Sequence, residues 1–135
     1  MSIYQTRAKK IPGTNVSEVK KVAFEVFKRI RRKSKRTPYV RSAYFKKDKI
    51  FLNLFWHHVF EKQWGDRKRR LQYFEAAIEL IQNSRIEPRI QTDPNNKSDL
   101  LYRFQGITKD NFTFCVQIKK DGGSGKKQLI SVFPI

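Results

Sequence analysis

The chain has 135 residues, which is enough for one domain of ordinary size but not for two. Hydrophobic residues make up 39% of the sequence and aromatic residues 13%, so a packed core can form and wholesale disorder is excluded. The 30 Lys and Arg residues far exceed the 12 Asp and Glu residues, and the resulting net charge of +18 favours a polyanionic partner over a small neutral substrate.

The first expected element along the chain is a helix that follows a tail. Residues 1–14 are mostly polar and contain a Pro-Gly pair, which predicts a flexible tail, and a single domain is expected over residues 15–135. Asn15 can cap a helix and Glu18, three residues later, can bond back to it, while apolar residues follow at helical spacing. Pro38 ends the helix, because a proline disfavours helical backbone at the preceding residue.

The end of this helix is a basic run from Lys28 to Arg36. Such a run is a solvated helix end, a nuclear-import signal or a contact with nucleic-acid phosphates. We favour phosphate contact, because residues 1–70 contain 21 basic and 5 acidic residues, a net charge of +16. The remaining residues contain 9 basic and 7 acidic residues, a net charge of only +2. The expected contacts in the run are Arg29, Arg31, Arg32, Lys33, Lys35 and Arg36.

Two strands, Tyr39–Phe45 and Lys49–Phe55, are expected on either side of a polar turn, and a short helix over residues 56–60 follows them. This helix carries adjacent histidines, His57 and His58, whose side chains would point about 100° apart, so at most one is expected to face a given pocket. That histidine is either a packed, hydrogen-bonded side chain or a general acid or base. No metal site is expected at the pair, which lacks supporting carboxylates.

A second clear helix is expected from Asp66, which can cap it, with an apolar stripe from Leu71 to Ile81. Its first turn would place four cations at the positive end of the helix dipole, which is more easily understood if a phosphate lies nearby. These further candidate nucleic-acid contacts are Arg67, Lys68, Arg69 and Arg70. Residues 83–98 contain two prolines and an Asn-Asn pair and are predicted to be loop.

The last third of the chain alternates like a sheet. Strands are expected over residues 100–105, 112–119 and 128–133, with a glycine-rich hairpin connection over 121–125. The predicted fold class is α+β, with N-terminal helices packed on a C-terminal antiparallel sheet that includes a meander over residues 100–134.

Aromatic residues interleave with the cations, as stacking platforms do in single-strand binders. Tyr39 and Tyr102 are the best candidates for stacking on a base, although most aromatic residues in a domain of this size belong to the core.

Three polar residues of the last strands could form a cluster for phosphate chemistry: Arg103, Lys119 and Ser131. Neighbouring antiparallel strands bring side chains on one face within about 5 Å of each other. Arg103 and Lys119 alternate against apolar stripes, whereas Ser131 is predicted to share its side with Leu129 and Phe133. Each of the three could also be an ordinary solvent-facing strand residue.

Short motifs follow one another along residues 49–135: Trp56-His57-His58-Val59, Ala76 to Ile81, Pro88-Arg89-Ile90, Leu101-Tyr102-Arg103-Phe104, Phe114 to Lys119 and Leu129 to Pro134. In this order the chain resembles the barnase/EndoU/colicin/RelE-like ribonuclease superfamily. The resemblance implies a small α+β nuclease, often a toxin, that cuts RNA through attack by the 2′-hydroxyl without a metal.

Carried over by position, the resemblance assigns roles to four places in this chain. His57 or His58 would match the helix histidine, Arg103 and Lys119 the basic strand residues, and Ser131 the terminal threonine. The chain departs from the pattern in having two histidines for one place and Ser-Val-Phe at the end, so a catalytically silent relative is an alternative.

The leading functional prediction is therefore a toxin-like, metal-independent endoribonuclease that needs no cofactor. The first alternative is a non-catalytic RNA- or DNA-binding module that uses the basic N-terminal half. A third interpretation is a factor bound to acidic protein or ribosomal RNA. RNA is the expected partner, and an acidic inhibitor or antitoxin protein is a further one. The start of the chain has no apolar signal segment and there is one cysteine, so a cytoplasmic protein without a membrane partner is expected.

Overall fold

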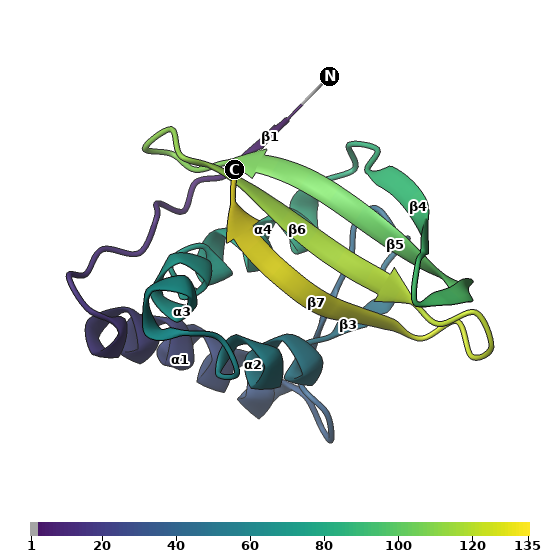
Figure 1. Ribbon diagram of the computed structural model, residues 1–135, viewed down its shortest axis with the longest axis horizontal. Coiled ribbons are helices and arrows are strands. Elements are labelled where there is room, and N and C mark those ends of the chain that lie inside the picture. Colours follow the sequence, from purple (N-terminus) through teal and green to yellow (C-terminus); the bar gives the residue numbers. More distant parts are fainter. Residues whose placement is uncertain (1–2) are drawn as a thin grey trace.

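The structure is a computed structural model that describes residues 3–135, with Trp64 described only in its backbone. Within this range four helices and seven strands form an α+β domain, in which α1, α2 and α3 lie together on one side of a curled sheet (Figure 1). The helices are α1 (Val16–Lys33), α2 (Asn53–Val59), α3 (Trp64–Leu71) and α4 (Phe74–Asn83). The strands are β1 (Tyr4–Gln5), β2 (Tyr39–Arg41), β3 (Lys49–Phe51), β4 (Arg89–Asp93), β5 (Asn96–Ile107), β6 (Thr113–Lys120) and β7 (Lys127–Pro134).

The sheet order is β1-β5-β6-β7-β3-β2, and β4 also pairs with β5. The expected α+β class is therefore present, and the meander of β5, β6 and β7 is antiparallel. Two pairings were not predicted: β1 runs parallel to β5, and β3 runs parallel to β7. Strands from the N-terminal half thus extend both edges of the C-terminal meander.

The N-terminal segment packs on the domain where a tail was predicted. Tyr4 and Gln5 pair with the end of β5, and Ile11 is buried in the core. The carboxylate of Glu79 accepts hydrogen bonds from the backbone amides of Arg7 (2.8 Å) and Ala8 (2.9 Å), which holds the segment against α4. Residues 1 and 2 of the predicted tail lie outside the described residues. The polar composition gave no sign of these long-range contacts.

The predicted cap of α1 is confirmed. The side chain of Asn15 accepts a hydrogen bond from the backbone amide of Glu18 at 3.1 Å and donates one to its carboxylate, also at 3.1 Å. The buried face consists of Val19, Ala23, Val26 and Phe27. Lys33 is the last helical residue, so the helix ends before the predicted stop at Pro38. The part of the basic run up to Lys33 lies in the last turns, where cations suit the helix dipole, and Lys35 and Arg36 lie beyond the helix.

The second helix begins earlier than predicted. Residues 53–55 were expected to be strand, but α2 already starts at Asn53 and β3 ends at Phe51. Phe55 and Val59, four residues apart, bury the same helical face, and this 3.6-residue period prevails over the short alternation read from the sequence.

The single helix predicted from Asp66 to Ile81 is two helices, because the chain breaks between α3 and α4 at Gln72 and Tyr73. Gln72 is fixed there by bonds to Ile11: its carbonyl accepts from the Ile11 amide at 2.9 Å, and its side chain donates to the Ile11 carbonyl at 3.1 Å. The helix also starts at Trp64 rather than at Asp66.

This earlier start corrects the prediction about the helix dipole. Lys68, Arg69 and Arg70 occupy the last turn of α3, not its first, so the dipole favours them without any phosphate. Asp66 lies in the first turn and pairs with Arg69 at 3.0 Å and Arg70 at 3.2 Å.

The loop predicted over residues 83–98 is wrong for its second half, because β4 and the start of β5 form a hairpin there. The turn is closed by Asp93, whose carboxylate accepts from the amide of Asn95 at 2.9 Å. Most residues of β4 are exposed, so the sequence there has no alternation of apolar and polar residues that would predict a strand.

The core lies on one face of the meander. Tyr102, Phe104, Phe114, Val116 and Ile118 alternate onto this face, where they join the buried residues of the helices. The opposite face carries Arg103, Gln117 and Lys119, so polar side chains are available there to contact a ligand. No helix in the described part of the chain is long and apolar enough to cross a membrane.

Candidate active site

A groove of about 520 Å³ opens between α2, the end of α3 and the polar face of β5, β6 and β7. Apolar side chains such as Phe55 and Leu101 form part of its wall. Its polar lining includes six side chains that can bond a phosphate or move a proton: His58, Arg70, Arg103, Gln117, Lys119 and Ser131. We call it the His58 groove. It brings together residues from distant parts of the sequence.

Three of these residues form a row across the meander. Arg103 of β5 pairs in register with Gln117 of β6, which pairs with Ser131 of β7. Arg103 donates a hydrogen bond to the side-chain oxygen of Gln117 at 3.1 Å. The partner of the guanidinium is thus neutral, so this contact does not balance the positive charge of Arg103.

A β-bulge places Ser131 on this face. Gln117 pairs with Ser131 whereas Ile118 pairs with Leu129, so Ile130 is an extra residue in β7. Leu129 and Val132 are both buried in the core, and Ile130 and Ser131 both line the groove. The predicted sharing of a side by Ser131 and Leu129 is therefore wrong, because strict alternation does not hold through a bulge.

Arg70 is held at the groove by two partners. Its Nη1 donates to the hydroxyl of Ser131 at 2.7 Å, and its Nε donates to Asp66 at 3.2 Å. The hydrogen bond from Arg69, and then that from Arg70, hold the pKa of Asp66 below its usual range although burial opposes the shift. The guanidinium carbons of Arg70 and Arg103 lie 5.7 and 5.9 Å from the ring centre of Phe133, so two cations share one aromatic ring.

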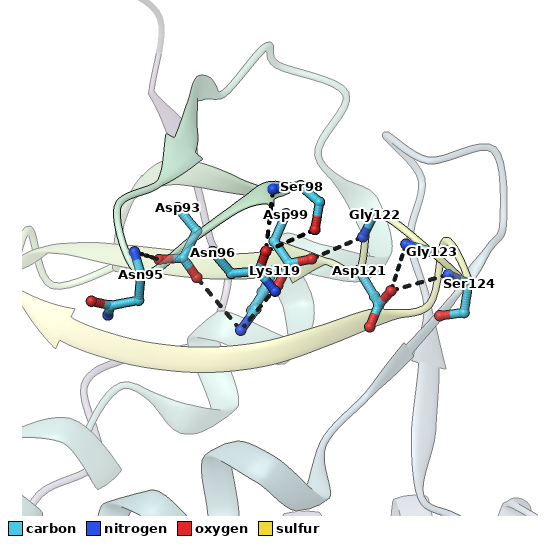
Figure 2. Close-up of polar contacts among 10 residues, drawn as sticks. All are labelled: Asp93, Asn95, Asn96, Ser98, Asp99, Lys119, Asp121, Gly122, Gly123 and Ser124. Carbon is cyan, nitrogen blue, oxygen red and sulfur yellow. Dashed lines mark hydrogen bonds and ion pairs between the residues drawn. The ribbon is translucent and has the colours of Figure 1, made fainter.

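Lys119 lies between two aspartates (Figure 2). Its Nζ is 3.5 Å from Asp93 and 3.4 Å from Asp99, and Asp99 is almost fully buried. Burial lowers the pKa of Lys119, but the hydrogen bonds and charges of Asp99 and Asp93 outweigh it and leave that pKa above its ordinary value. The three groups together carry a net charge of −1, so Lys119 adds no net positive charge to the groove.

A hairpin supports this ion cluster. Asp99 accepts a hydrogen bond from the amide of Gly122 at 2.9 Å, and Asp121 accepts from the amides of Gly123 and Ser124 at 2.7 and 3.0 Å (Figure 2). A Cβ on Gly122 would overlap the carbonyl oxygen of Ser98, so only glycine permits this approach. The position of Lys119 therefore depends on the hairpin between β6 and β7.

The two histidines are separated by the helix, as the spacing predicts. His58 lines the groove, whereas His57, also exposed, does not belong to its lining. The carbonyl of His57 and that of His58 both accept from the amide of Phe60, which closes the end of α2.

The predicted nucleic-acid contacts are distributed over the molecule. Tyr102 is 7% exposed and packs edge-on against Phe45 in the core, so it cannot stack on a base, and that prediction is wrong. Tyr39 is half-buried and lines a second, larger groove together with Arg29 and Lys33. Four other cations of the basic run are exposed outside that lining: Arg31, Arg32, Lys35 and Arg36. In α3 only Arg70 reaches the His58 groove; Arg67, Lys68 and Arg69 do not line it.

Sequence reasoning missed the polar residues that hold the predicted ones. Gln117 lies two residues before Lys119 on the same strand face, so alternation could have found it. Asp93 and Asp99 lie in and beside a segment predicted as loop, and nothing local indicated that they would meet Lys119. Arg70 was predicted as a nucleic-acid contact, and its bond to Ser131 adds it to the groove.

A smaller pocket of about 180 Å³ adjoins the groove at Arg103 and contains Cys115. Burial raises the pKa of the Cys115 thiol to about 11, although the charge of Arg103 opposes the shift, so the thiol is neutral at physiological pH and a poor nucleophile. Over residues 3–135, no three His, Cys, Asp or Glu side chains are grouped so that they could hold a metal ion.

Comparisons of the chain with protein-family models, with curated proteins and with solved structures found no match.

Proposed function

We propose that the protein is a metal-independent endoribonuclease of the toxin type and that the His58 groove is its active site. The observation that carries this proposal is the meeting of one imidazole with two arginines and a hydroxyl in a single concave site. General acid or base catalysis at phosphate requires this combination of a titratable group and fixed cations. The resemblance of the sequence motifs to a ribonuclease superfamily supports the same function.

The reaction begins with the ribose 2′-hydroxyl. The neutral imidazole of His58 takes its proton, and the 2′-oxygen attacks the adjacent phosphorus. The bond from phosphorus to the 5′-oxygen breaks, and this oxygen takes a proton from water. The imidazolium of His58 gives its proton to the resulting hydroxide, which restores water and the neutral imidazole. The products are a 2′,3′-cyclic phosphate and a 5′-hydroxyl, and no oxidant, metal or cofactor is needed.

Arg103 and Arg70 stabilise the extra negative charge that develops on the phosphate oxygens. Arg103 is bonded to neutral Gln117 and can give its remaining N–H groups to the phosphate. Ser131 orients Arg70 through their 2.7 Å hydrogen bond. The charge of Lys119 is balanced by two aspartates, so this residue adds no net charge to the groove. It fixes the end of the groove and can donate a hydrogen bond to the substrate.

The test is cleavage of end-labelled RNA in the presence of EDTA. We expect cyclic-phosphate products from the wild-type protein and a fall of about 10²–10⁴ in rate for His58→Ala, the usual contribution of a general base. His57→Ala is the matched control, since it removes an exposed imidazole from the same helix outside the groove. Absence of cleavage by the wild-type protein, or equal rates in both variants, would contradict the proposal.

A nucleic-acid-binding module without catalysis is the second candidate. It is favoured by the basic groove that Arg29 and Lys33 line, which is separate from the His58 groove and contains neither histidine. Such a module would bind RNA tightly and with strong salt dependence but leave it intact in the same experiment.

A further inference from the structure

A groove larger than the His58 groove lies along the C-terminal half of α1. This basic groove, of about 1450 Å³, is formed by the C-terminal half of α1, β2, the turn over residues 42–48 and the exposed side of α4. It shares no lining residue with the His58 groove. We propose that it is a second RNA site, which binds the phosphodiester backbone of a long RNA at a distance from the cut. The choice of RNA as the polyanion rests on the proposed function.

Charge is the first support for this proposal. Seven basic residues line the groove against two acidic ones, a net charge of +5. Among the described residues, none of the seven forms an ion pair within 4.0 Å, so their charges are available to a ligand. One of the two carboxylates, Glu79, is already engaged by the amides of Arg7 and Ala8 and by the hydroxyl of Tyr4. Its role is to hold the N-terminal segment.

The turn over residues 42–48 is the second support. Lys46 and Lys47 both have positive φ values, 54° and 70°, in the left-handed region that side chains other than glycine rarely adopt. Two consecutive lysines therefore occupy a strained conformation in which both are exposed and line the groove. Glycine would fit this backbone better, so the two lysines occupy the turn against the local conformational preference.

The surrounding contacts fix this strained turn. The amide of Lys47 donates to the carbonyl of Ser42 at 2.7 Å, and its own carbonyl accepts from Nη1 of Arg41 at 3.0 Å. The amide of Ala43 donates to the carbonyl of Ile81 at 3.0 Å, which ties the turn to α4. The two ammonium groups are thus carried on a rigid support rather than on a mobile loop.

The dimensions favour a chain over a single small molecule. Pockets for small ligands usually measure about 300–1,000 Å³, whereas this groove is larger and its cations come from four separate segments. Cations at the N-terminal segment (Arg7), α1 (Arg29, Lys33), the 41–47 segment and the residues just after α4 (Arg85) suit successive phosphates of one strand.

The first experiment replaces the strained lysines by glycine. The Lys46→Gly/Lys47→Gly variant relieves the backbone and removes two charges, so we expect its Tm to rise by about 4 °C while its affinity for an RNA of about 20 nucleotides falls roughly tenfold. The slope of log affinity against log salt concentration should decrease by about 0.7 for each phosphate that the variant no longer neutralises. A higher Tm with unchanged affinity and slope would overturn the proposal, since the lysines would then have no role in RNA binding.

The second experiment compares two pairs of cations on α1. Arg29→Gln/Lys33→Gln removes charges that line the groove, and Arg31→Gln/Arg32→Gln removes the same number of charges from the same helix outside it. We expect the first pair to weaken RNA binding roughly tenfold and to decrease the salt slope by about 1.4, and the second pair to have a clearly smaller effect. Equal effects would show that only total charge matters and would overturn the assigned groove.

Failure of this proposal is distinguishable from failure of the proposed function. RNA binding is measured with the His58→Ala variant, so it does not depend on cleavage. Cleavage that requires His58, combined with binding that is indifferent to groove variants, would remove the second site alone. Groove variants that bind RNA normally but bind an acidic protein less tightly would indicate that the ligand of the groove is that protein. This result would also overturn the proposal.

Discussion

The two grooves differ in how their cationic side chains are held in place. In the His58 groove three of the four lining cations are fixed by specific partners, Arg70 by Asp66 and Ser131, Arg103 by Gln117, and Lys119 by two aspartates, while the fourth, Lys62, is exposed. In the basic groove seven cations line the surface without an ion pair among the described residues. The first site combines mostly fixed cations with a net lining charge of +3, and the second combines a net lining charge of +5 with few constraints.

This difference corresponds to two physical tasks. Stabilising charge that appears only during a reaction requires groups that are already oriented, because reorientation would cost free energy at that moment. Attracting a polyanion requires net potential over a wide surface, and exact placement contributes little. The following four predictions test this division, from the largest expected effect to the smallest.

Replacing Arg103 tests the fixed groove most directly. Arg103→Gln removes the charge but retains hydrogen-bonding groups beside Gln117, and we expect the rate of RNA cleavage to fall by about 10²–10³ with little change in RNA affinity. Lys109→Gln, an equal reduction of charge at an exposed position, is the control. Single-turnover cleavage and filter binding measure the two quantities. Weaker affinity with an unchanged rate would assign Arg103 to binding instead.

The buried carboxylate beneath Lys119 is predicted to be important for stability. Asp99→Asn removes an ion pair and weakens the acceptor of the Gly122 amide, so we expect the free energy of unfolding to fall by about 1–3 kcal/mol in urea titrations. Asp48→Asn is the matched change at an exposed carboxylate that pairs with Lys127, and its effect should be smaller. Similar decreases in the two variants would show that the cluster around Lys119 is not special.

The pH dependence of stability measures how well the Cys115 thiol, beside Arg103, is shielded from solvent on this side of the sheet. Because burial raises the pKa of Cys115 to about 11, the unfolded thiol, with a pKa of about 8.5, ionises first as the pH rises. The native state therefore loses stability above a pH of about 8.5, by about 1 kcal/mol at a pH of about 9.5, and continues to lose it up to a pH of about 11. A Cys115→Ala variant lacks this effect, so its stability should fall less steeply over this range. Parallel profiles for the two proteins would show that the thiol is not shielded.

The smallest effect is expected at Asp66, which holds Arg70 from within α3. Its lowered pKa means that its contribution is present above the unfolded pKa and disappears as the pH falls through the folded value. Asp66→Asn should therefore remove a few tenths of a kcal/mol at a pH of about 7, as for other helical ion pairs, and nothing at a pH of about 2. A chemical denaturation series at the two pH values measures this. A larger decrease at the acidic pH than at the neutral one would contradict the sign.

The sequence allowed prediction of those parts of the fold that depend on local periodicity. The cap of α1 at Asn15, the alternation of β5 and β6 and the glycine-rich hairpin are all encoded by residues that are near one another in the chain. The break before Tyr73 and the pairing of β1 with β5 depend on contacts between distant segments, such as the bond of Gln72 to Ile11, so no local pattern could reveal them.

The same distinction applies to the candidate site. Arg103, Lys119 and Ser131 were found because adjacent strands align residues of one face, and one of the two histidines was expected to join them. Which histidine does so depends on the rotation of α2 against β7, a property of tertiary packing. The balance of charge at Lys119 was equally hidden, because Asp93 and Asp99 come from a hairpin that the sequence did not announce.

The extra residue in β7 has a consequence for protein engineering and for the alignment of related chains. Deleting Ile130 would restore a regular ladder in which Leu129, Ser131 and Val132 alternate, so Ser131 would still face the groove and Val132 the core. Any comparison of this strand with a homologue must therefore permit a one-residue gap at this position, since an ungapped alignment would match inward-facing with outward-facing residues from there to the end of the strand.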